Sequence, residues 1–277
     1  MQRVRIPAGE LAHLDRGAGA PVLLIHGFPL DHTMWDAQID ALANTARVIA
    51  PDLRGFGESP RGDVDSNQGI SMEQFADDLV ALLDAIGITE PIVLVGMSMG
   101  GYIAWQFIGR YPERVRALVQ LDTRAIADDE ETRAGRLKMA HNVAEWGSGR
   151  VAEMMGPRLF SPRAFETKPG LVAAVRRVVE ATSPATIAAA QRGMASRPDV
   201  TGMLSSISVR TLVIVGDQDV ISPPAEMEAI AQAIPNSEFV VIPNSGHMTT
   251  MEQPEIVNEA LREFITSLDR RHLTPST

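Results

Sequence analysis

The pentapeptide Gly96-Met97-Ser98-Met99-Gly100 contains the residue types that most clearly suggest chemistry. It follows the apolar run Ile92–Val95 and precedes a segment with helical spacing. A serine nucleophile projects from a tight turn between a strand and a helix, where bulky neighbours on either side would clash. The amides at the start of the helix would face the negative charge that develops during acyl transfer. The sequence therefore predicts Ser98 as a nucleophile, with an ordinary glycine-rich turn as the alternative.

A serine nucleophile needs a histidine beside it as base, because serine is a weak nucleophile at neutral pH. His247 follows the last apolar run, Phe239–Ile242, which places it at the carboxyl edge of a parallel sheet, where ligands bind. We therefore predict His247 as the base. The other histidines are expected at surface or loop positions: His13 in an N-terminal hairpin, His141 in a helical region, His272 in the tail, and His26 and His32 around one loop.

The acid that orients the histidine is expected between Ser98 and His247 in the chain. The apolar run Thr211–Val215 leads into Gly216-Asp217-Gln218-Asp219. We favour Asp219, because it lies on a loop that can turn back toward the histidine. Asp217 is still close to the strand end and is expected to be a structural turn residue. Asp122, which follows the apolar run Ala117–Leu121, remains an alternative.

The oxyanion formed by attack on a carbonyl needs at least two N–H donors. One is expected from Met99, directly after the nucleophile. The other is expected from Phe28, in the loop His26-Gly27-Phe28-Pro29, because glycine allows close approach and proline has no N–H. We expect His26 to hold this loop by hydrogen bonds rather than to react.

Apolar side chains near these positions are candidates for lining a substrate pocket. The candidates are Leu30, Met97, Met154, Met155, Met194 and Met248, with flexible packing as the alternative for the methionines. In the segment Asp52–Ser59 we expect Arg54 and Asp52 to brace a loop, with a role at the pocket mouth as the alternative. No zinc pattern or phosphate-binding loop is present, so we expect no metal and no cofactor.

The elements that must position these residues alternate between buried strands and helices. Apolar runs occur at Pro21–Ile25, Val48–Ala50, Ile92–Val95, Ala117–Leu121, Thr211–Val215 and Phe239–Ile242, and helical segments separate most of them. This pattern predicts an α/β fold with a mostly parallel, twisted sheet of about eight strands and helices on both faces. Between Thr123 and Arg197 the pattern is helical only, with helices expected at Glu130–Trp146, Val151–Met155, Leu171–Ala181 and Ala185–Met194. We predict a core of residues 1–123 and 198–277 and a helical cap of residues 124–197.

The composition of the 277-residue chain is that of an ordinary globular protein, with 45% hydrophobic and 22% charged residues. Its net charge of −10 argues against binding to nucleic acid or to an anionic membrane. The absence of cysteine excludes disulfides, thiolate catalysis and cysteine-ligated metals. No apolar stretch approaches the roughly 20 residues that span a bilayer, and Met1–Pro7 does not read as a secretory signal. We therefore expect a cytoplasmic monomer or small homo-oligomer that acts on a small molecule.

Taken together, these residues resemble the α/β-hydrolase superfamily over nearly the whole chain. The chain is most similar to bacterial carboxylesterases with a helical cap, through Gly27–Asp31, Ser98–Tyr102 and Ile221–Pro224. It also resembles 3-oxoadipate enol-lactonases. The resemblance implies a triad of Ser98, Asp219 and His247, a covalent acyl-enzyme and no cofactor. We expect the cap to close over the acyl group and limit its length, which favours short- to medium-chain ester substrates. Lactone cleavage, or a ligand receptor that does not turn over, remain alternatives.

Overall fold

A computed structural model describes residues 1–62 and 68–270 of the chain. Within this part, an eight-stranded sheet has the order β1-β2-β4-β3-β5-β6-β7-β8. The hairpin of β1 and β2 joins β4 in antiparallel pairing, whereas the strands from β4 to β8 are parallel. This arrangement confirms the predicted fold class. The strands are β1 (Gln2–Ile6), β2 (Gly9–Arg16), β3 (Ala20–Ile25), β4 (Ala46–Pro51), β5 (Ile92–Met97), β6 (Val115–Leu121), β7 (Arg210–Gly216) and β8 (Ser237–Ile242).

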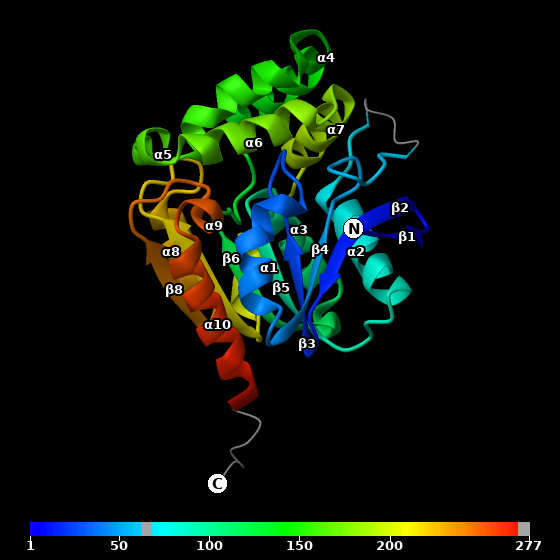
Figure 1. Cartoon of the computed structure of the whole chain (residues 1–277), viewed down its shortest axis with the longest axis vertical. Coiled ribbons are helices and arrows are strands. Elements are labelled where there is room, and N and C mark those ends of the chain that lie inside the picture. Colours follow the sequence, from blue (N-terminus) through cyan, green and yellow to red (C-terminus); the bar gives the residue numbers. More distant parts are fainter. Residues whose placement is uncertain (63–67, 271–277) are drawn as a thin grey trace.

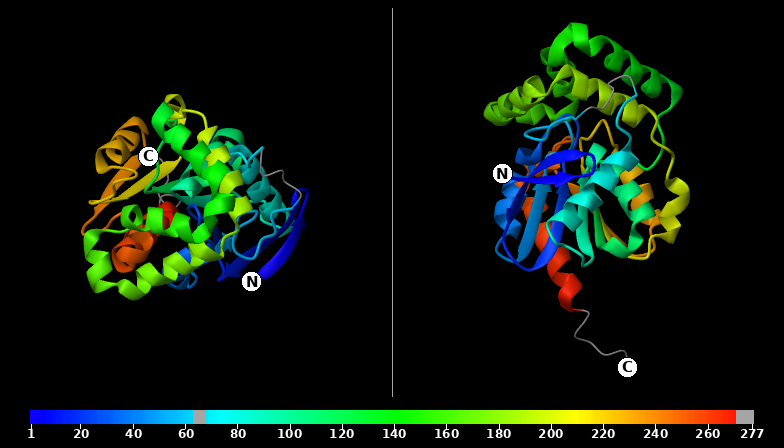
Figure 2. Two further views of the ribbon diagram at one scale, coloured as in Figure 1. Left: turned by 90° about the horizontal axis from the view of Figure 1, so that it is seen from above. Right: turned by 90° about the vertical axis from the view of Figure 1, so that its right-hand side faces the viewer.

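Helices cover both faces of the sheet, which explains why the central strands are continuous apolar runs. On one face lie α1 (Asp36–Leu42) and α10 (Pro254–Arg270), and on the other lie α2 (Met72–Ala85), α3 (Met99–Arg110) and α8 (Pro224–Ala233) (Figures 1 and 2). Every residue of β5 is buried. Among the described residues, no helix is both long and apolar enough to cross a membrane.

Four further helices form a layer over one edge of the sheet (Figure 1). We call this the helical layer: α4 (Glu130–Leu159), α5 (Pro162–Thr167), α6 (Pro169–Ala181) and α7 (Pro184–Ala195). Gly147, with a φ of 74°, interrupts α4 between its two halves, where the sequence predicts separate helices. The short helix α5 was not predicted. These helices fall within residues 124–197, and their status as a separate cap domain stays a prediction.

Arg54 and Asp52 both hold the loop after β4, as predicted, and each does so through its own partners. Arg54 pairs with Asp78 of α2 at 2.5 Å. The buried Asp52 accepts hydrogen bonds from His32 N (2.8 Å), His32 Nδ1 (2.7 Å) and Glu58 N (2.8 Å). Burial alone would lower the pKa of His32, yet its hydrogen bond to Asp52 and the charge of that carboxylate raise its pKa above the usual 6.5. Burial would likewise raise the pKa of Asp52, but the bonds from His32 and Glu58 lower it below 3.8.

The His32–Asp52 pair predicts a pH-dependent contribution to stability. Because the pKa of His32 is raised in the folded state, the stabilisation is fully present below pH 6.5 and is lost as the pH rises through the folded-state pKa. We expect His32→Asn to lower the free energy of unfolding by about 1.5–3 kcal/mol at pH 6 and by less at pH 9. Urea unfolding of wild type and variant at both pH values measures this. His141→Asn, at an exposed position of α4, is the control; equal losses at both pH values would contradict the prediction.

Candidate active site

Ser98, His247 and Asp219 meet at the carboxyl edge of the sheet. Ser98 lies between β5 and α3, Asp219 follows β7, and His247 follows β8. The distance from His247 Nε2 to Ser98 Oγ is 2.8 Å, and that from His247 Nδ1 to Asp219 Oδ2 is also 2.8 Å. The histidine and the aspartate are buried, whereas Ser98 is half-buried and remains accessible. The structure thus brings together the three residues that the sequence singled out.

Ser98 occupies a strained turn that its glycine neighbours make possible. Its φ of 55° and ψ of −116° are rare for a residue with a side chain. The Ser98 N–H donates to Leu121 O at 3.0 Å, and Thr123 Oγ1 donates to Ser98 O at 2.8 Å. A Cβ on Gly96 would lie 2.4 Å from the carbonyl oxygen of Gly100. The turn is therefore fixed on both sides, and the serine is held at one position above the sheet.

Gly100→Ala is expected to disrupt this turn. An added Cβ would lie 2.1 Å from Ile25 O and 2.9 Å from His26 O, and these backbone atoms cannot move without displacing β3. We expect a loss of about 1–3 kcal/mol in the free energy of unfolding, measured by urea titration. The control is Gly135→Ala in α4, where a Cβ meets nothing within 4 Å and helix propensity improves. A Gly100 variant as stable as wild type would contradict the close packing.

The partners of Asp219 determine which nitrogen of His247 carries the proton. Asp219 Oδ1 accepts hydrogen bonds from Ile221 N (2.7 Å) and Ser222 N (3.0 Å), and Oδ2 faces His247 Nδ1. Because a carboxylate only accepts, Nδ1 must donate to it. The other nitrogen, Nε2, is then free to accept the Ser98 hydroxyl hydrogen. This is the arrangement that a base for Ser98 requires.

The two alternative aspartates lie nearby but have other partners. Asp217 Oδ1 accepts from Ser245 N at 3.1 Å, as expected of a turn residue. Asp122 is fully buried; its Oδ1 accepts from Gly216 N at 3.0 Å, and its Oδ2 bonds to Thr249 Oγ1. Burial, and secondly the charge of Asp219, raise the pKa of Asp122 well above its usual value of 3.8. The charged form of Asp122 is therefore disfavoured, and its hydrogen bonds to Gly216 and Thr249 give it a structural role at the end of β6.

The loop after β3 lies directly against Ser98. A Cβ on Gly27 would lie 2.9 Å from Met97 Sδ and 3.3 Å from Ser98 Cβ. His26 holds the loop, as expected: its Nε2 accepts from Leu53 N at 3.0 Å, and its Nδ1 lies 2.9 Å from Gly27 O. In the described part of the chain, Phe28 N–H has no hydrogen-bond partner. The first N–H groups of a helix have no acceptor within it, and Met99 begins α3.

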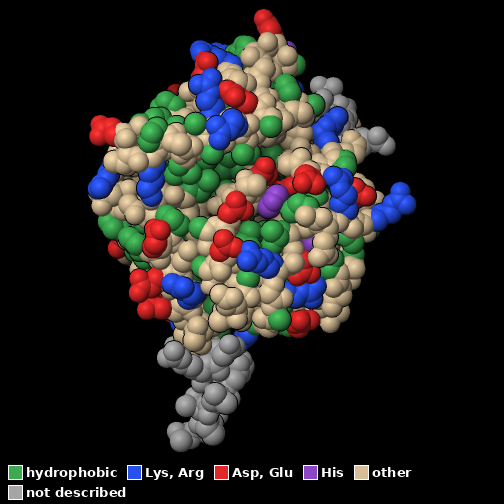
Figure 3. Space-filling model, in the orientation of Figure 1, with side chains coloured by type: hydrophobic (Ala, Val, Ile, Leu, Met, Phe, Trp, Pro, Cys, Tyr) green, Lys and Arg blue, Asp and Glu red, His purple; other side chains and the backbone are tan. Residues whose placement is uncertain are grey.

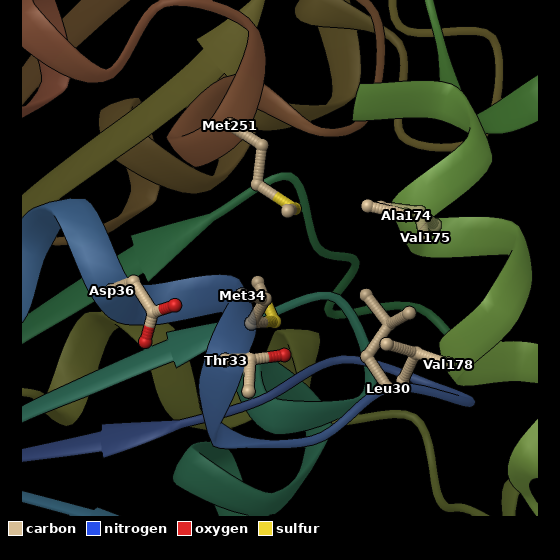
Figure 4. A pocket seen from close by; sticks show the side chains of 8 residues that line it. All are labelled: Leu30, Thr33, Met34, Asp36, Ala174, Val175, Val178 and Met251. Carbon is tan, nitrogen blue, oxygen red and sulfur yellow. The ribbon is translucent and has the colours of Figure 1, made fainter. Parts of the chain in front are cut away.

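A cavity of about 180 Å³ opens between this loop and the helical layer. Figure 4 shows Met251 and Leu30 pointing toward each other across the space above Met34. Ala174 and Val175 of α6 lie on the side of this space away from Asp36. In Figure 3, hydrophobic side chains gather in a recess below the helical layer. The cavity is lined by mostly apolar residues: Leu30, Thr33, Met34, Asp36, Ala174, Val175, Val178 and Met251.

The predicted pocket residues are spread over several places. Leu30 lines the cavity, whereas none of the five predicted methionines is among its lining residues. Met154 is 43% exposed on α4. The others are buried or half-buried: Met97 beside Ser98, Met248 beside His247, Met155 in α4 and Met194 in α7.

Sequence reasoning missed Met34, Met251, Val175 and Val178, which line the cavity. Met251 could have been identified as a lining residue from its position four residues, about one helical turn, after His247. Val175 and Val178 could have been identified from the spacing of apolar residues along one side of α6.

The remaining histidines do not join the site. His13, expected at the surface, is buried in β2, where its neighbours Leu11 and Ala12 are buried as well. His272 lies outside the described residues. Asp31, His32 and Asp52 bring potential metal-ligand atoms within 4.8 Å of one another. Within this group, His32 donates hydrogen bonds to Asp52 through its main-chain N and its Nδ1.

The comparisons with known proteins agree on the fold, although the matched proteins carry different activities. The family model described as alpha/beta hydrolase fold matches residues 20–158 and 174–254. A thermophilic esterase from Thermogutta terrifontis, solved with malate bound, is 47% identical, with a TM-score of 0.93 over 97% of this chain and 99% of that one. An enol-lactonase from Burkholderia xenovorans LB400 is 25% identical, with a TM-score of 0.87 over 96% and 100%. An AB hydrolase superfamily protein of Bacillus subtilis is 30% identical over 91% of this chain and 94% of its own.

Proposed function

Because this chain belongs to the α/β-hydrolase family, we propose that it is a serine hydrolase that cleaves carboxylic esters through Ser98. The observation that carries the proposal is the continuous hydrogen-bonded series from Ser98 Oγ through His247 to Asp219. The high similarity to an esterase supports ester substrates in particular. The similarity to an enol-lactonase makes lactones the alternative to be tested.

In the proposed reaction, His247 Nε2 takes the Ser98 proton while Oγ attacks the ester carbonyl. The N–H groups of Phe28 and Met99 donate hydrogen bonds to the resulting oxyanion. The bond to the alcohol then breaks, and His247 gives its proton to the leaving oxygen. A water molecule, deprotonated by His247, then attacks the acyl-enzyme. The bond between the acyl carbon and Ser98 Oγ breaks, His247 returns its proton to Oγ, and the carboxylic acid leaves. Asp219 keeps the Nδ1 proton in place throughout.

The cavity at Leu30 supports a neutral, short- to medium-chain substrate. Its side chains are largely apolar, and its lining includes no lysine or arginine that would bind a carboxylate. Asp36, at its margin (Figure 4), would repel an anionic group. We propose that this cavity takes an apolar part of the ester, and that residues 124–197 act as a cap over it, inserted into a core of residues 1–123 and 198–277.

The test compares p-nitrophenyl acetate, butyrate and octanoate with γ-butyrolactone and an enol-lactone that carries a carboxylate. We expect the highest kcat/KM on the acetate or butyrate ester and a much lower value on the anionic lactone. A higher kcat/KM on the lactones would replace the ester assignment by lactonase. Stoichiometric labelling of Ser98 by an organophosphate, without multiple turnover on any substrate, would instead indicate a ligand receptor.

A further inference from the structure

Glu252 is a buried carboxylate next to the candidate active site that the proposed reaction does not use. It ends α9 (Thr249–Glu252), five residues after His247, and is 2% exposed. Its Oε1 accepts hydrogen bonds from Gly246 N (2.8 Å) and Ser245 Oγ (3.5 Å). Its Oε2 accepts from Ser161 N (3.0 Å) and Ser161 Oγ (2.5 Å). One carboxylate thus joins the loop that carries His247 to a distant part of the chain.

The distant part is the short connection between α4 and α5 of the helical layer. It lies in direct contact with the histidine loop: a Cβ on Gly246 would be 2.6 Å from Ser161 N and 2.7 Å from the carbonyl carbon of Phe160. Lys168, between α5 and α6, also donates a hydrogen bond to the main-chain oxygen of Glu252. The residue before His247 is therefore packed between Glu252 and the helical layer.

In the described part of the chain, the hydrogen-bond donors to this carboxylate are all neutral N–H and O–H groups. Burial and the charge of Asp219 are the larger causes that raise the pKa of Asp122, and the carboxylate of Glu252 contributes to the same shift. Its four hydrogen bonds tie the Ser245–Gly246 segment, which directly precedes His247, to Ser161.

We propose that Glu252 is a positioning residue that clamps Gly246 against Ser161 and so holds the His247 imidazole in line with Ser98. The clamp makes the geometry of the base depend on the docking of the helical layer. This inference rests on the proposed hydrolase function. It follows that loosening the clamp lowers the rate of bond cleavage while leaving substrate binding at the cavity intact.

The test uses Glu252→Gln in the full-length protein, with p-nitrophenyl butyrate as substrate. An amide offers one acceptor oxygen, so its NH₂ group must face one of the two backbone N–H donors, of Gly246 or Ser161. We expect kcat to fall about 10- to 100-fold, the effect of a small displacement of a catalytic group, while KM changes less than twofold. Glu255→Gln removes an exposed carboxylate three residues away and is the matched control.

Ser161→Ala tests the same clamp from the helical layer and removes a single hydroxyl donor. We expect a smaller fall in kcat, again at unchanged KM. The double variant should lose less than the product of the two single effects, because both changes break one clamp. Organophosphate titration of Ser98 gives the concentration of folded sites, so that kcat is expressed per folded molecule.

Two outcomes would overturn the inference. One is a lower melting temperature with kcat per titrated site unchanged, which would make Glu252 purely structural. The other is a fall in kcat for the double variant equal to the product of the single effects. Absence of ester turnover by the wild type would instead contradict the proposed function, so the two failures are distinguishable.

Discussion

Ser98→Ala is expected to abolish the burst of p-nitrophenol from p-nitrophenyl acetate and to lower kcat by roughly 10⁶-fold. Without Oγ no acyl-enzyme forms, and any remaining turnover depends on water and the N–H groups of Phe28 and Met99. The variant should unfold at the same urea concentration as wild type, because the Ser98 turn is held through backbone atoms by Leu121 and Thr123.

Stopped-flow burst kinetics and mass spectrometry after organophosphate treatment measure the effect. Ser205→Ala, at an exposed position, is the control and should keep both the burst and the label. Near-native turnover by Ser98→Ala would remove the serine from the mechanism.

Replacement by asparagine is expected to affect kcat very differently at two buried aspartates, Asp122 and Asp219. In Asp219→Asn, the side-chain oxygen must stay with Ile221 N and Ser222 N, so the NH₂ group faces His247 Nδ1. That contact favours the tautomer with hydrogen on Nε2, which cannot accept the Ser98 proton. We expect kcat to fall by roughly 10⁴-fold.

In Asp122→Asn, the amide oxygen keeps the bond from Gly216 N, and the NH₂ group donates to Thr249 Oγ1, whose hydroxyl turns from donor to acceptor. We expect kcat to stay within a few-fold of wild type. Because the pKa of Asp122 is raised in the folded state, wild type loses stability as the pH rises above 3.8 toward the folded-state value, and asparagine removes that loss. The variant should therefore gain stability relative to wild type between pH 5 and pH 8 in urea unfolding.

Steady-state kinetics on p-nitrophenyl butyrate separate the two positions. A large fall in kcat for Asp122→Asn with little effect of Asp219→Asn would reverse the assignment of the acid.

The residues of the candidate triad could be found from sequence because local patterns mark each one. Apolar runs identify strands that are buried on both faces, and polar residues directly after them must lie at one edge of a parallel sheet. Gly96 and Gly100 mark the turn at Ser98, since a Cβ at either position would meet backbone atoms. These signals lie within a few residues of the side chains they predict.

The cavity and the role of Glu252 could not be found in this way, because they depend on how the helical layer docks on the sheet. Ser161 and Glu252 are 91 residues apart, and no periodic pattern connects them. The prediction that Met154 lines the pocket failed for the same reason, because the sequence does not show which side of α4 faces the sheet. Val151 and Ala152 are buried, whereas Met154 is exposed.

The adjacency of β6 and β7 has a consequence for how such a protein can diversify. These strands are parallel neighbours, with Leu121 opposite Ile214, so the chain leaves and re-enters the sheet at adjacent positions. Doubling the length of a connecting segment costs only about 0.6 kcal/mol in closure entropy. The helices between β6 and β7 can therefore be replaced or lengthened without changing the register of the two strands. Such a change would have to keep a hydrogen-bond donor for Glu252 in the place of Ser161. Selection for a new substrate would act most readily on the segment between β6 and β7.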